Sequence, residues 1–297
     1  MLLIKDLNVK IDNKQILSDI NFTFSEGFLS VFWNSWAWKT TLLQSILWNI
    51  KESTWEIILN DKNLTNIKIK DRNIWIVFQD FVLFPNKTVL ENIEIGKHKE
   101  EQLKKDLIHK LWITDILNRY PHEISGGEQQ RVAIIRTLIT RPDILLLDEP
   151  FNNLDSINKI KLQKELKVIL EELDIPTILV THDRNDIFFF WWNVLILKDW
   201  KQIEYNNVID IYNKPKNKYI AELFWEINII NNKFIRPENV ILKKITCKKN
   251  KNNYFIKEII NYGMYYRCVI TNNIDKIISY TDIEYNLLDE VTFIIKK

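Results

Sequence analysis

The chain has 297 residues, of which 46% are hydrophobic, and a formal net charge of +2 from 41 basic and 39 acidic residues. This length suits two domains better than one. Because the basic and acidic residues nearly balance, the composition argues against a nucleic-acid partner, which usually needs a concentrated basic surface. Two cysteines make no disulfide framework, and the longest apolar run, near residues 187–197, is shorter than the about 20 residues that span a bilayer. The composition therefore predicts a cytosolic protein that reaches any membrane through a partner.

Short apolar segments alternate with amphipathic segments over the first two thirds of the chain. In chain order, the expected elements are a strand at 29–32, a helix at 39–47, a strand at 74–78, several helices within 98–140, a strand at 144–147, a helix at 156–173, and strands at 177–180 and 194–197. Strands that alternate with helices predict an α/β fold with a mostly parallel sheet and helices on its faces.

The composition changes after about residue 230. Residues 252–297 contain runs rich in Ile, Tyr, Thr and Val, which Asn, Asp and Gly separate. Such runs favour strands, and the residues between them favour turns. The C-terminal part is therefore expected to be a small β domain.

A pair of carboxylates follows the expected strand at residues 144–147. Because that strand reads Ile-Leu-Leu-Leu, Asp148 and Glu149 should stand at the carboxyl edge of the sheet, where ligands bind in open α/β folds. One carboxylate there can hold a metal ion, and the other can orient an attacking water molecule. Taken alone, the pattern fits a strand that ends in two solvated acids at least as well.

A second motif, ISGGEQQR at residues 124–131, places two glycines before a helical segment. Bare main-chain N–H groups at a helix N-terminus form an anion site, although Ser125 before the glycines also fits an ordinary helix cap. The complete string resembles the signature sequence of ATP-binding-cassette (ABC) ATPases. After it come Asp148-Glu149, Asn153-Leu154-Asp155 and Thr181-His182-Asp183, which match the family's Walker B segment, D-loop and H-loop in order. The resemblance implies a P-loop NTPase core with a helical subdomain.

This resemblance requires a phosphate loop, and residues 33–41 read Trp-Asn-Ser-Trp-Ala-Trp-Lys-Thr-Thr. The pattern is G-x-x-x-x-G-K-[ST], to which the family adds an internal glycine. Lys39 and Thr40 are in place, but tryptophan stands at each glycine position. The loop wraps phosphates with main-chain N–H groups and needs positive φ angles, which glycine supplies and an indole would obstruct.

The tryptophan count suggests one cause. The chain has 11 tryptophans and 5 glycines, where a usual share of about 7% would give about 20 glycines. The tryptophans stand where related ATPases carry glycine or another small or turn residue, at Trp33, Trp36, Trp38, Trp48, Trp55, Trp75, Trp112, Trp191, Trp192, Trp200 and Trp225. We infer that the gene uses UGA for glycine and that tryptophan stands in its place in the translated sequence. The alternative, a degenerate cassette that lost its loop, leaves the other eight tryptophans unexplained.

By resemblance, each motif has a role at an ATP site. The residues that would bind ATP are Trp33, Asn34, Ser35, Trp36, Ala37, Trp38, Lys39, Thr40 and Thr41 and, from a second copy of the chain, Ser125, Gly126, Gly127 and Asp155. Mg²⁺ would be held by Thr40, Gln79 and Asp148. Glu149 would polarise the attacking water, His182 would contact the γ-phosphate, and Gln79 would also lie near the membrane partner. Ile11 stands where the family usually stacks an aromatic residue on adenine.

Two further segments resemble one branch of the family. LFPNKTVLENI at residues 83–93 resembles a string of importer ATPases for polyamines, ferric iron, sulfate, molybdate and sugars, and IRPENV at 235–240 resembles the start of their TOBE domain. This implies a nucleotide-binding domain at residues 1–225, with a helical subdomain at about 85–140, and an OB-like TOBE domain at 226–297. A polyamine or ferric-iron importer is preferred. The alternatives are the other importers or a soluble ABC ATPase, which usually carries tandem cassettes or long coiled-coil insertions.

The resemblance also implies partners. An importer ATPase would work with two transmembrane permease subunits, a second ATPase subunit and an extracytoplasmic solute-binding protein. It would lie on the cytoplasmic face of the membrane, with ATP and Mg²⁺ as its cofactors.

Overall fold

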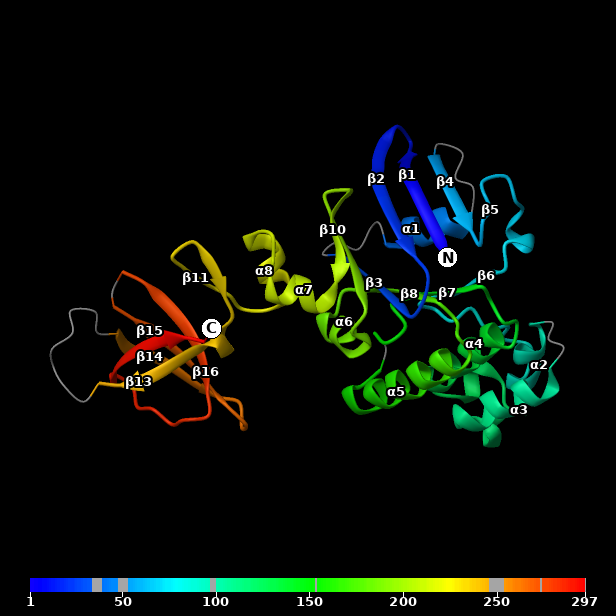
Figure 1. The fold of residues 1–297 in the computed structure, drawn as a ribbon. Coiled ribbons are helices and arrows are strands. Elements are labelled where there is room, and N and C mark those ends of the chain that lie inside the picture. Colours follow the sequence, from blue (N-terminus) through cyan, green and yellow to red (C-terminus); the bar gives the residue numbers. More distant parts are fainter. Residues whose placement is uncertain are drawn as a thin grey trace. The chain divides into compact units, whose positions relative to one another are not determined.

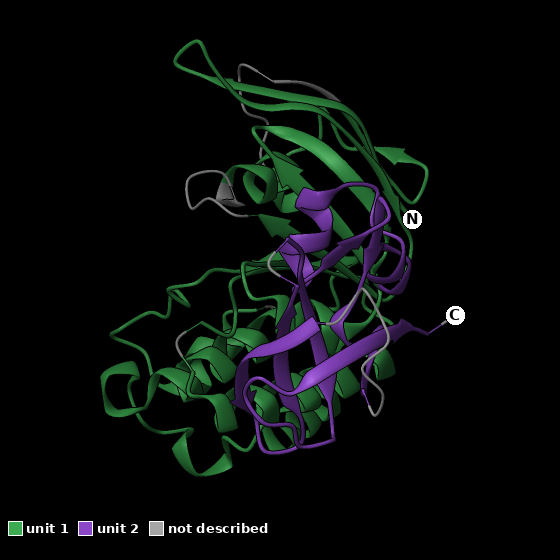
Figure 2. Cartoon of the chain, turned by 90° about the vertical axis from the view of Figure 1, so that its left-hand side faces the viewer, with its two compact units in different colours: residues 1–208 green, residues 209–297 purple. Residues whose placement is uncertain are grey.

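The computed structural model describes residues 1–33, 39–47, 53–96, 100–152, 154–245, 254–272 and 274–296, without the side chains of residues 39, 40 and 53–55. The chain forms two compact units, residues 1–208 and residues 209–297 (Figure 2). None of the helices in these ranges is long and apolar enough to cross a membrane.

A mixed sheet is the centre of the first unit. In its described part the strand order is β5-β4-β1-β2-β10-β9-β3-β8-β7-β6. The strands are β1 (Leu2–Ile11), β2 (Lys14–Phe24), β3 (Phe28–Trp33), β4 (Ser53–Leu59), β5 (Lys62–Asn63), β6 (Ile74–Val77), β7 (Ile144–Asp148), β8 (Thr177–Thr181), β9 (Asn193–Lys198) and β10 (Lys201–Asn207). The expected parallel pairing holds from β9 to β6, whereas β1, β2, β4 and β5 pair antiparallel.

Helices cover both faces of the parallel strands. They are α1 (Lys39–Leu47), α2 (Val89–Glu94), α3 (Glu101–Lys110), α4 (Gly126–Leu138), α5 (Ser156–Glu172) and α6 (Arg184–Phe190), with 3₁₀ turns at Ile69–Asp71, Thr114–Ile116 and Pro121–Glu123. In Figure 1, α2 to α5 lie together on one side of the parallel strands, while α1, β1, β2 and β4 lie on the other. The helical subdomain expected at about 85–140 corresponds to α2, α3 and α4.

The buried strands owe their position to continuous apolar runs. Every residue of β3, β7 and β8 is buried, as strands covered on both faces should be. Alternate residues serve the two cores: Leu145 and Leu147 join the core under α2 to α5, whereas Ile144 and Leu146 join the core with α1 and the N-terminal strands. The β7 strand pairs in parallel with β6 and β8 and ends at Asp148, so it brings the acids to the edge of the sheet.

The second unit is a small antiparallel β structure preceded by helices. Its elements are α7 (Val208–Asn213), α8 (Lys218–Phe224), β11 (Asn228–Ile230), β12 (Lys233–Ile235), a 3₁₀ turn at Pro237–Asn239, β13 (Val240–Lys244), β14 (Tyr254–Asn261), β15 (Tyr266–Thr271), β16 (Lys276–Thr281) and β17 (Glu290–Ile295). The strands form the sheet β13-β17-β14-β15-β16 and the hairpin β11-β12. The β structure expected near the C-terminus is present, and its assignment as a TOBE domain remains a prediction.

The second unit begins earlier than residue 226, where the sequence placed the boundary. Arg236 explains the difference, because its guanidinium donates hydrogen bonds to the carbonyl oxygens of Tyr212, Ala221 and Trp225 at 2.9–3.1 Å. Arg236 is 3% exposed. A single buried arginine therefore ties α7 and α8 to the β structure that follows them.

Candidate functional site

The site forms at the carboxyl edge of neighbouring parallel strands. β8 pairs with both β3 and β7, so the segments that follow these strands emerge at the same edge. Asp148 is the last residue of β7 and is 7% exposed, Glu149 follows at 5%, and His182 follows β8. The structure thus places Asp148 and Glu149 at the sheet edge where the sequence predicted them, and it brings His182 to the same edge.

Glu149 is held in a constrained position. Its φ of 47° lies in the left-handed region, and its N–H donates to the Val180 carbonyl at 3.0 Å. Its Oε1 lies 3.3 Å from His182 Nδ1, and its Oε2 accepts a hydrogen bond from the Asn152 amide. A strained backbone persists where the surroundings over-determine it, often at functional sites. The carboxylate is therefore fixed beside the imidazole by groups from both strand ends.

The structure describes the predicted phosphate loop only at its two ends. Trp33 closes β3 and is buried, and Lys39 and Thr40 form the start of α1. Thr41 is buried, and its carbonyl accepts a hydrogen bond from the Ser45 hydroxyl at 2.6 Å. The predicted residues Asn34, Ser35, Trp36, Ala37 and Trp38 lie outside the described residues, as does Asn153 of the D-loop motif. The loop joins the end of β3 to the N-terminus of α1, which is the strand-to-helix setting that a phosphate loop needs.

A second group of predicted residues lines a cavity of about 340 Å³. Ser125, Gly126, Gly127 and Asp155 all face this cavity, together with Leu154. Asp155 caps α5, because its Oδ1 accepts the N–H groups of residues 157 and 158. The structure therefore joins the signature and D-loop motifs on one face, although 30 residues separate them in the chain.

Ser125 is a helix cap, as the simpler interpretation of its motif held. Its hydroxyl accepts the Glu128 N–H at 3.3 Å, and the Glu128 carboxylate accepts the Ser125 N–H at 2.7 Å. A Cβ placed on Gly126 would meet no atom within 4 Å, whereas one on Gly127 would lie 3.1 Å from Leu154. Ser125 thus caps α4, and the main chain of Gly126 is still open to a ligand.

Gln79 lies in the turn after β6, half-buried. The next turn is strained, since Phe81 and Val82 have φ of 57° and 44°. Arg136 on α4 reaches this turn, and its guanidinium donates to the carbonyls of Phe81 and Val82, each at 2.9 Å. The helix that begins within the signature motif is therefore bonded to the turn that follows Gln79.

At some tryptophans the backbone lies in the left-handed region, which favours glycine. Three of the eight tryptophans with a described backbone have positive φ: Trp112 at 56°, Trp191 at 55° and Trp200 at 68°. The loop between β9 and β10 consists of Asp199 and Trp200, both with positive φ, which matches a type I′ turn and its strong Asp-Gly preference. Trp191 ends α6 in the left-handed conformation that glycine most often supplies there.

The remaining tryptophans are less informative. Trp33 is buried in the core, and Trp225 donates a hydrogen bond from Nε1 to the Tyr280 hydroxyl at 2.9 Å. Trp192 packs so closely on Gly27 that a Cβ there would lie 2.5 Å from the indole. The positive φ angles at Trp112, Trp191 and Trp200 are thus the structural observation that favours glycine.

The chain is similar to ATP-binding proteins of transporters. The family model "ABC transporter" matches residues 17–152. The molybdate/tungstate import ATP-binding protein WtpC of Methanocaldococcus jannaschii is 35% identical over 93% of this chain and 91% of its own length. The chain belongs to the ATP-binding proteins of ABC transporters. It is an ABC-type ATPase.

Other relatives place this ABC ATPase among import proteins and known cassettes. The Fe(3+) ions import ATP-binding protein FbpC of Fusobacterium nucleatum is 30% identical over 84% of the chain and 73% of its own length. The spermidine/putrescine import ATP-binding protein PotA of Photobacterium profundum is 32% identical, but the match spans 63% of that protein. The dimeric ATP-binding cassette MJ0796, bound to ADP and Pi, superposes with a TM-score of 0.62 at 28% identity, covering 70% of this chain and 99% of that one.

Several residues at the site were not singled out from the sequence. Asn152 contacts Glu149, Arg136 holds the turn after Gln79, and Lys159 pairs with aspartates beside His182. Asn152 could have been suspected, because it lies three residues after Glu149 in the same motif. Arg136 and Lys159 carry no local signal, since their partners are distant in the chain.

Proposed function

We propose that the chain is the ATP-hydrolysing subunit of an ABC importer. The arrangement of Asp148, Glu149 and His182 at one sheet edge supports this, because one carboxylate can hold a metal ion and the next can orient water beside an imidazole. The similarity to one import ATP-binding protein over 93% of the chain supports the transport role. ATP turnover by such a subunit would drive transport through its partners.

The chemistry of the donor groups suits Mg²⁺. Mg²⁺ prefers oxygen ligands, and a site with few carboxylates leaves room for phosphate oxygens. Thr40, Gln79 and Asp148 would supply a hydroxyl, an amide and a carboxylate, and Mg²⁺ would neutralise charge on the phosphates. Lys39 and the main-chain N–H groups of residues 33–41 would position the phosphates, and Glu149 would orient the attacking water.

The second motif group would act on the ATP of another subunit. Ser125, Gly126 and Asp155 line a cavity of about 340 Å³, and in our assignment this surface closes on the phosphate loop of a second copy. The similarity to dimeric cassettes supports the pairing. Hydrolysis would therefore need two copies of the chain arranged head to tail.

We also infer that the eleven tryptophan positions carry glycine in the protein made by its own host. Three positive φ angles and the Asp199-Trp200 turn support this interpretation, beside the phosphate-loop pattern. A peptide mass spectrum of the native protein tests it. Peptides that contain glycine at these positions are expected, and tryptophan at residues 33, 36 and 38 would overturn it.

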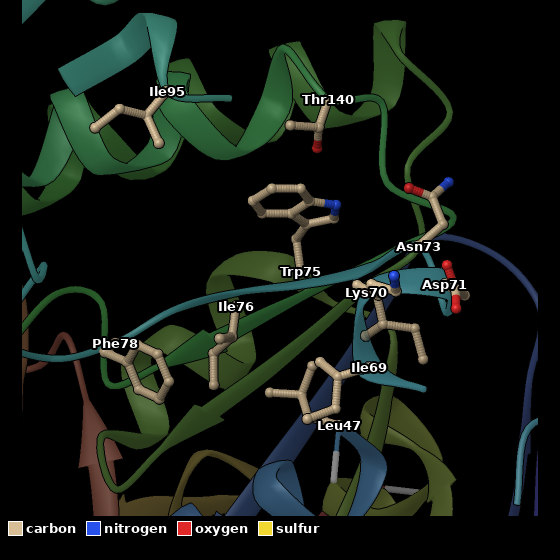
Figure 3. A pocket seen from close by; sticks show the side chains of 11 residues that line it. Leu47, Ile69, Lys70, Asp71, Asn73, Trp75, Ile76, Phe78, Ile95 and Thr140 are labelled. Atoms are coloured by element: carbon tan, nitrogen blue, oxygen red, sulfur yellow. The ribbon is translucent and has the colours of Figure 1, made fainter. Parts of the chain in front are cut away.

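A cavity beside the Gln79 turn is suited to a permease segment. It has a volume of about 730 Å³. Its lining is apolar at Leu47, Ile69, Phe78 and Ile95 and charged or polar at Lys70, Asp71, Asn73 and Thr140. Figure 3 shows the Trp75 side chain standing in this cavity, between Thr140 on one side and Ile69 on the other. Glycine at residue 75 would leave more room for an apolar helix of the partner.

The names of the relatives point to three kinds of transported solute: molybdate or tungstate, ferric iron, and polyamines. The sequence favoured a polyamine or ferric-iron importer, with sulfate, molybdate and sugar importers as alternatives. The match with the molybdate/tungstate protein covers 91% of that protein and extends well into the second unit, whereas the PotA match spans 63% of its relative. We therefore place a molybdate or tungstate importer ahead of the other two.

Reconstitution tests both the ATPase role and the identity of the transported solute. The chain, with glycine at its tryptophan positions, would be placed in proteoliposomes with its two permeases and a solute-binding protein. Uptake of labelled molybdate should require ATP and should stop in Lys39→Ala, whose loop lacks the phosphate-binding ammonium. Uptake of spermidine or ferric iron instead would correct the solute, and uptake by the Lys39→Ala chain would refute the ATPase role.

A further inference from the structure

Lys159 on α5 lies between two aspartates of the segment that follows β8. Its Nζ is 2.6 Å from Asp183 Oδ2 and 2.6 Å from Asp186 Oδ1. The side chains of Lys159 and Asp186 are 16% and 2% exposed. One ammonium group therefore serves two carboxylates in a place that is largely shielded from water, where charge contacts are stronger than at the surface.

The same contacts fasten the main chain on both sides of His182. The Thr181 hydroxyl donates to Asp186 Oδ2 at 2.6 Å and accepts the Asp183 N–H at 3.0 Å. Gln163, also on α5, donates from Nε2 to Asp186 Oδ1 at 2.8 Å. The residues before and after His182 are thus both tied to groups that α5 holds.

The Lys159 ammonium offsets the negative charge of the Asp183 and Asp186 carboxylates. Burial raises the pKa of Asp186, because a carboxylate removed from water is costly to ionise. Burial acts in the same direction on Asp183, but hydrogen bonds from Lys159 and the Asn185 N–H outweigh it and lower its pKa. Without Lys159, two neighbouring carboxylates would repel each other, and the segment that carries His182 would move.

Lys159 also stands one helical turn from the D-loop residue Asp155. Its N–H donates to the Asp155 carbonyl at 2.9 Å. We propose that Lys159 is a positioning residue for ATP hydrolysis, whose ion pairs with Asp183 and Asp186 set His182 beside Glu149 and tie it to the start of α5. This inference rests on the proposed role of His182 at the γ-phosphate.

Three variants of the chain with glycine at its tryptophan positions test this role. Lys159→Met removes the ammonium and keeps the stem, and Lys161→Met is the matched control, because Lys161 lies on the same helix with a side chain 52% exposed and one carboxylate 4.0 Å away. His182→Ala removes the group on which Lys159 is proposed to act. ATP turnover and melting temperature are measured for each single variant and for Lys159→Met combined with His182→Ala.

Lys159→Met should lower kcat about tenfold or more while KM for ATP changes little, since a small displacement of a catalytic group is costly and the phosphate loop is untouched. Lys161→Met should turn over ATP like the unchanged chain. In the His182→Ala background, Lys159→Met should cost no further activity, because residues that act through one another are non-additive.

An equal loss of kcat in the His182→Ala background would overturn the proposal, as would a Lys159→Met chain as active as Lys161→Met. An unchanged chain that fails to hydrolyse ATP would instead refute the proposed function. If Lys159→Met does not fold, Asp183→Asn decides. This variant keeps an amide oxygen that can cap α6, but it loses the carboxylate charge that pairs with Lys159. A lower kcat that is non-additive with His182→Ala supports the proposal. An unchanged kcat overturns it.

Discussion

Arg136 offers a quantitative test of how the helical subdomain holds the Gln79 segment. Its guanidinium binds the carbonyls of Phe81 and Val82, two residues with strained positive φ angles. Arg136→Met removes both hydrogen bonds and keeps most of the packing of the stem. Because the turn after Gln79 would be released, both the stability of the first unit and its ATP turnover should fall.

The structure sets the size of the effect. A hydrogen bond from a charged donor contributes about 1.5–3 kcal/mol. Val82 is 58% exposed, so water can replace the guanidinium there, whereas Phe81 is 8% exposed and its carbonyl would be left with a poorer partner. We therefore expect the free energy of unfolding to fall by about 2 kcal/mol, most of it from one bond.

Denaturant unfolding measures this loss, with Arg141→Met as the control. Arg141 pairs with Glu100 at 2.8 Å, but both side chains are about half exposed, and such pairs contribute about 0–1 kcal/mol. The reasoning fails if Arg136→Met and Arg141→Met have the same midpoint and slope. It also fails if Arg136→Met is destabilised as expected and hydrolyses ATP at the unchanged rate.

Three further predictions concern single residues. Glu149→Gln should retain ATP through gel filtration and lose turnover, and a normal rate would show that Glu149 is not the base. Ser125→Ala removes the cap of α4 and should lower the free energy of unfolding by about 1 kcal/mol in denaturant, a loss that Ser125→Asn should largely restore. Hydrogen bonds from Arg267 lower the pKa of Glu226 below its ordinary value of 4.5. The ionised Glu226 therefore stabilises the folded protein above pH 4.5, and this stabilisation is lost as the pH falls through the lowered pKa of the folded state. Glu226→Gln should speed amide exchange in β15 and β16 at neutral pH and have little effect in acid, and an equal effect at both would contradict this.

Much of the first unit could be predicted because its signals are local. Continuous apolar runs identified β3, β7 and β8 within one or two residues, and the acids after β7 fell at the sheet edge as expected. The capping box at Ser125 and Glu128 is likewise written in four consecutive residues. These features depend on neighbours in the chain, and so the sequence alone indicates them.

Other features depend on pairings that no local pattern reveals. Lys159 meets Asp183 across 24 residues, and Arg136 meets Phe81 across 55. The sheet was expected to be mostly parallel, but its N-terminal strands pair antiparallel, because amphipathic alternation in a strand does not say which neighbour it joins. The early start of the second unit follows from Arg236, which binds the carbonyls of Tyr212 and Ala221 on two helices that the sequence assigned to the first domain.

Hydrolysis of ATP by two versions of the chain tests the central claim most directly. One version carries tryptophan at all eleven positions, the other glycine, and each is compared with its Lys39→Ala variant. Bare main-chain amides between β3 and α1 should allow only the glycine version to release phosphate, and Lys39→Ala should abolish that release. Equal hydrolysis by the tryptophan version, lost in its own Lys39→Ala variant, would contradict the account.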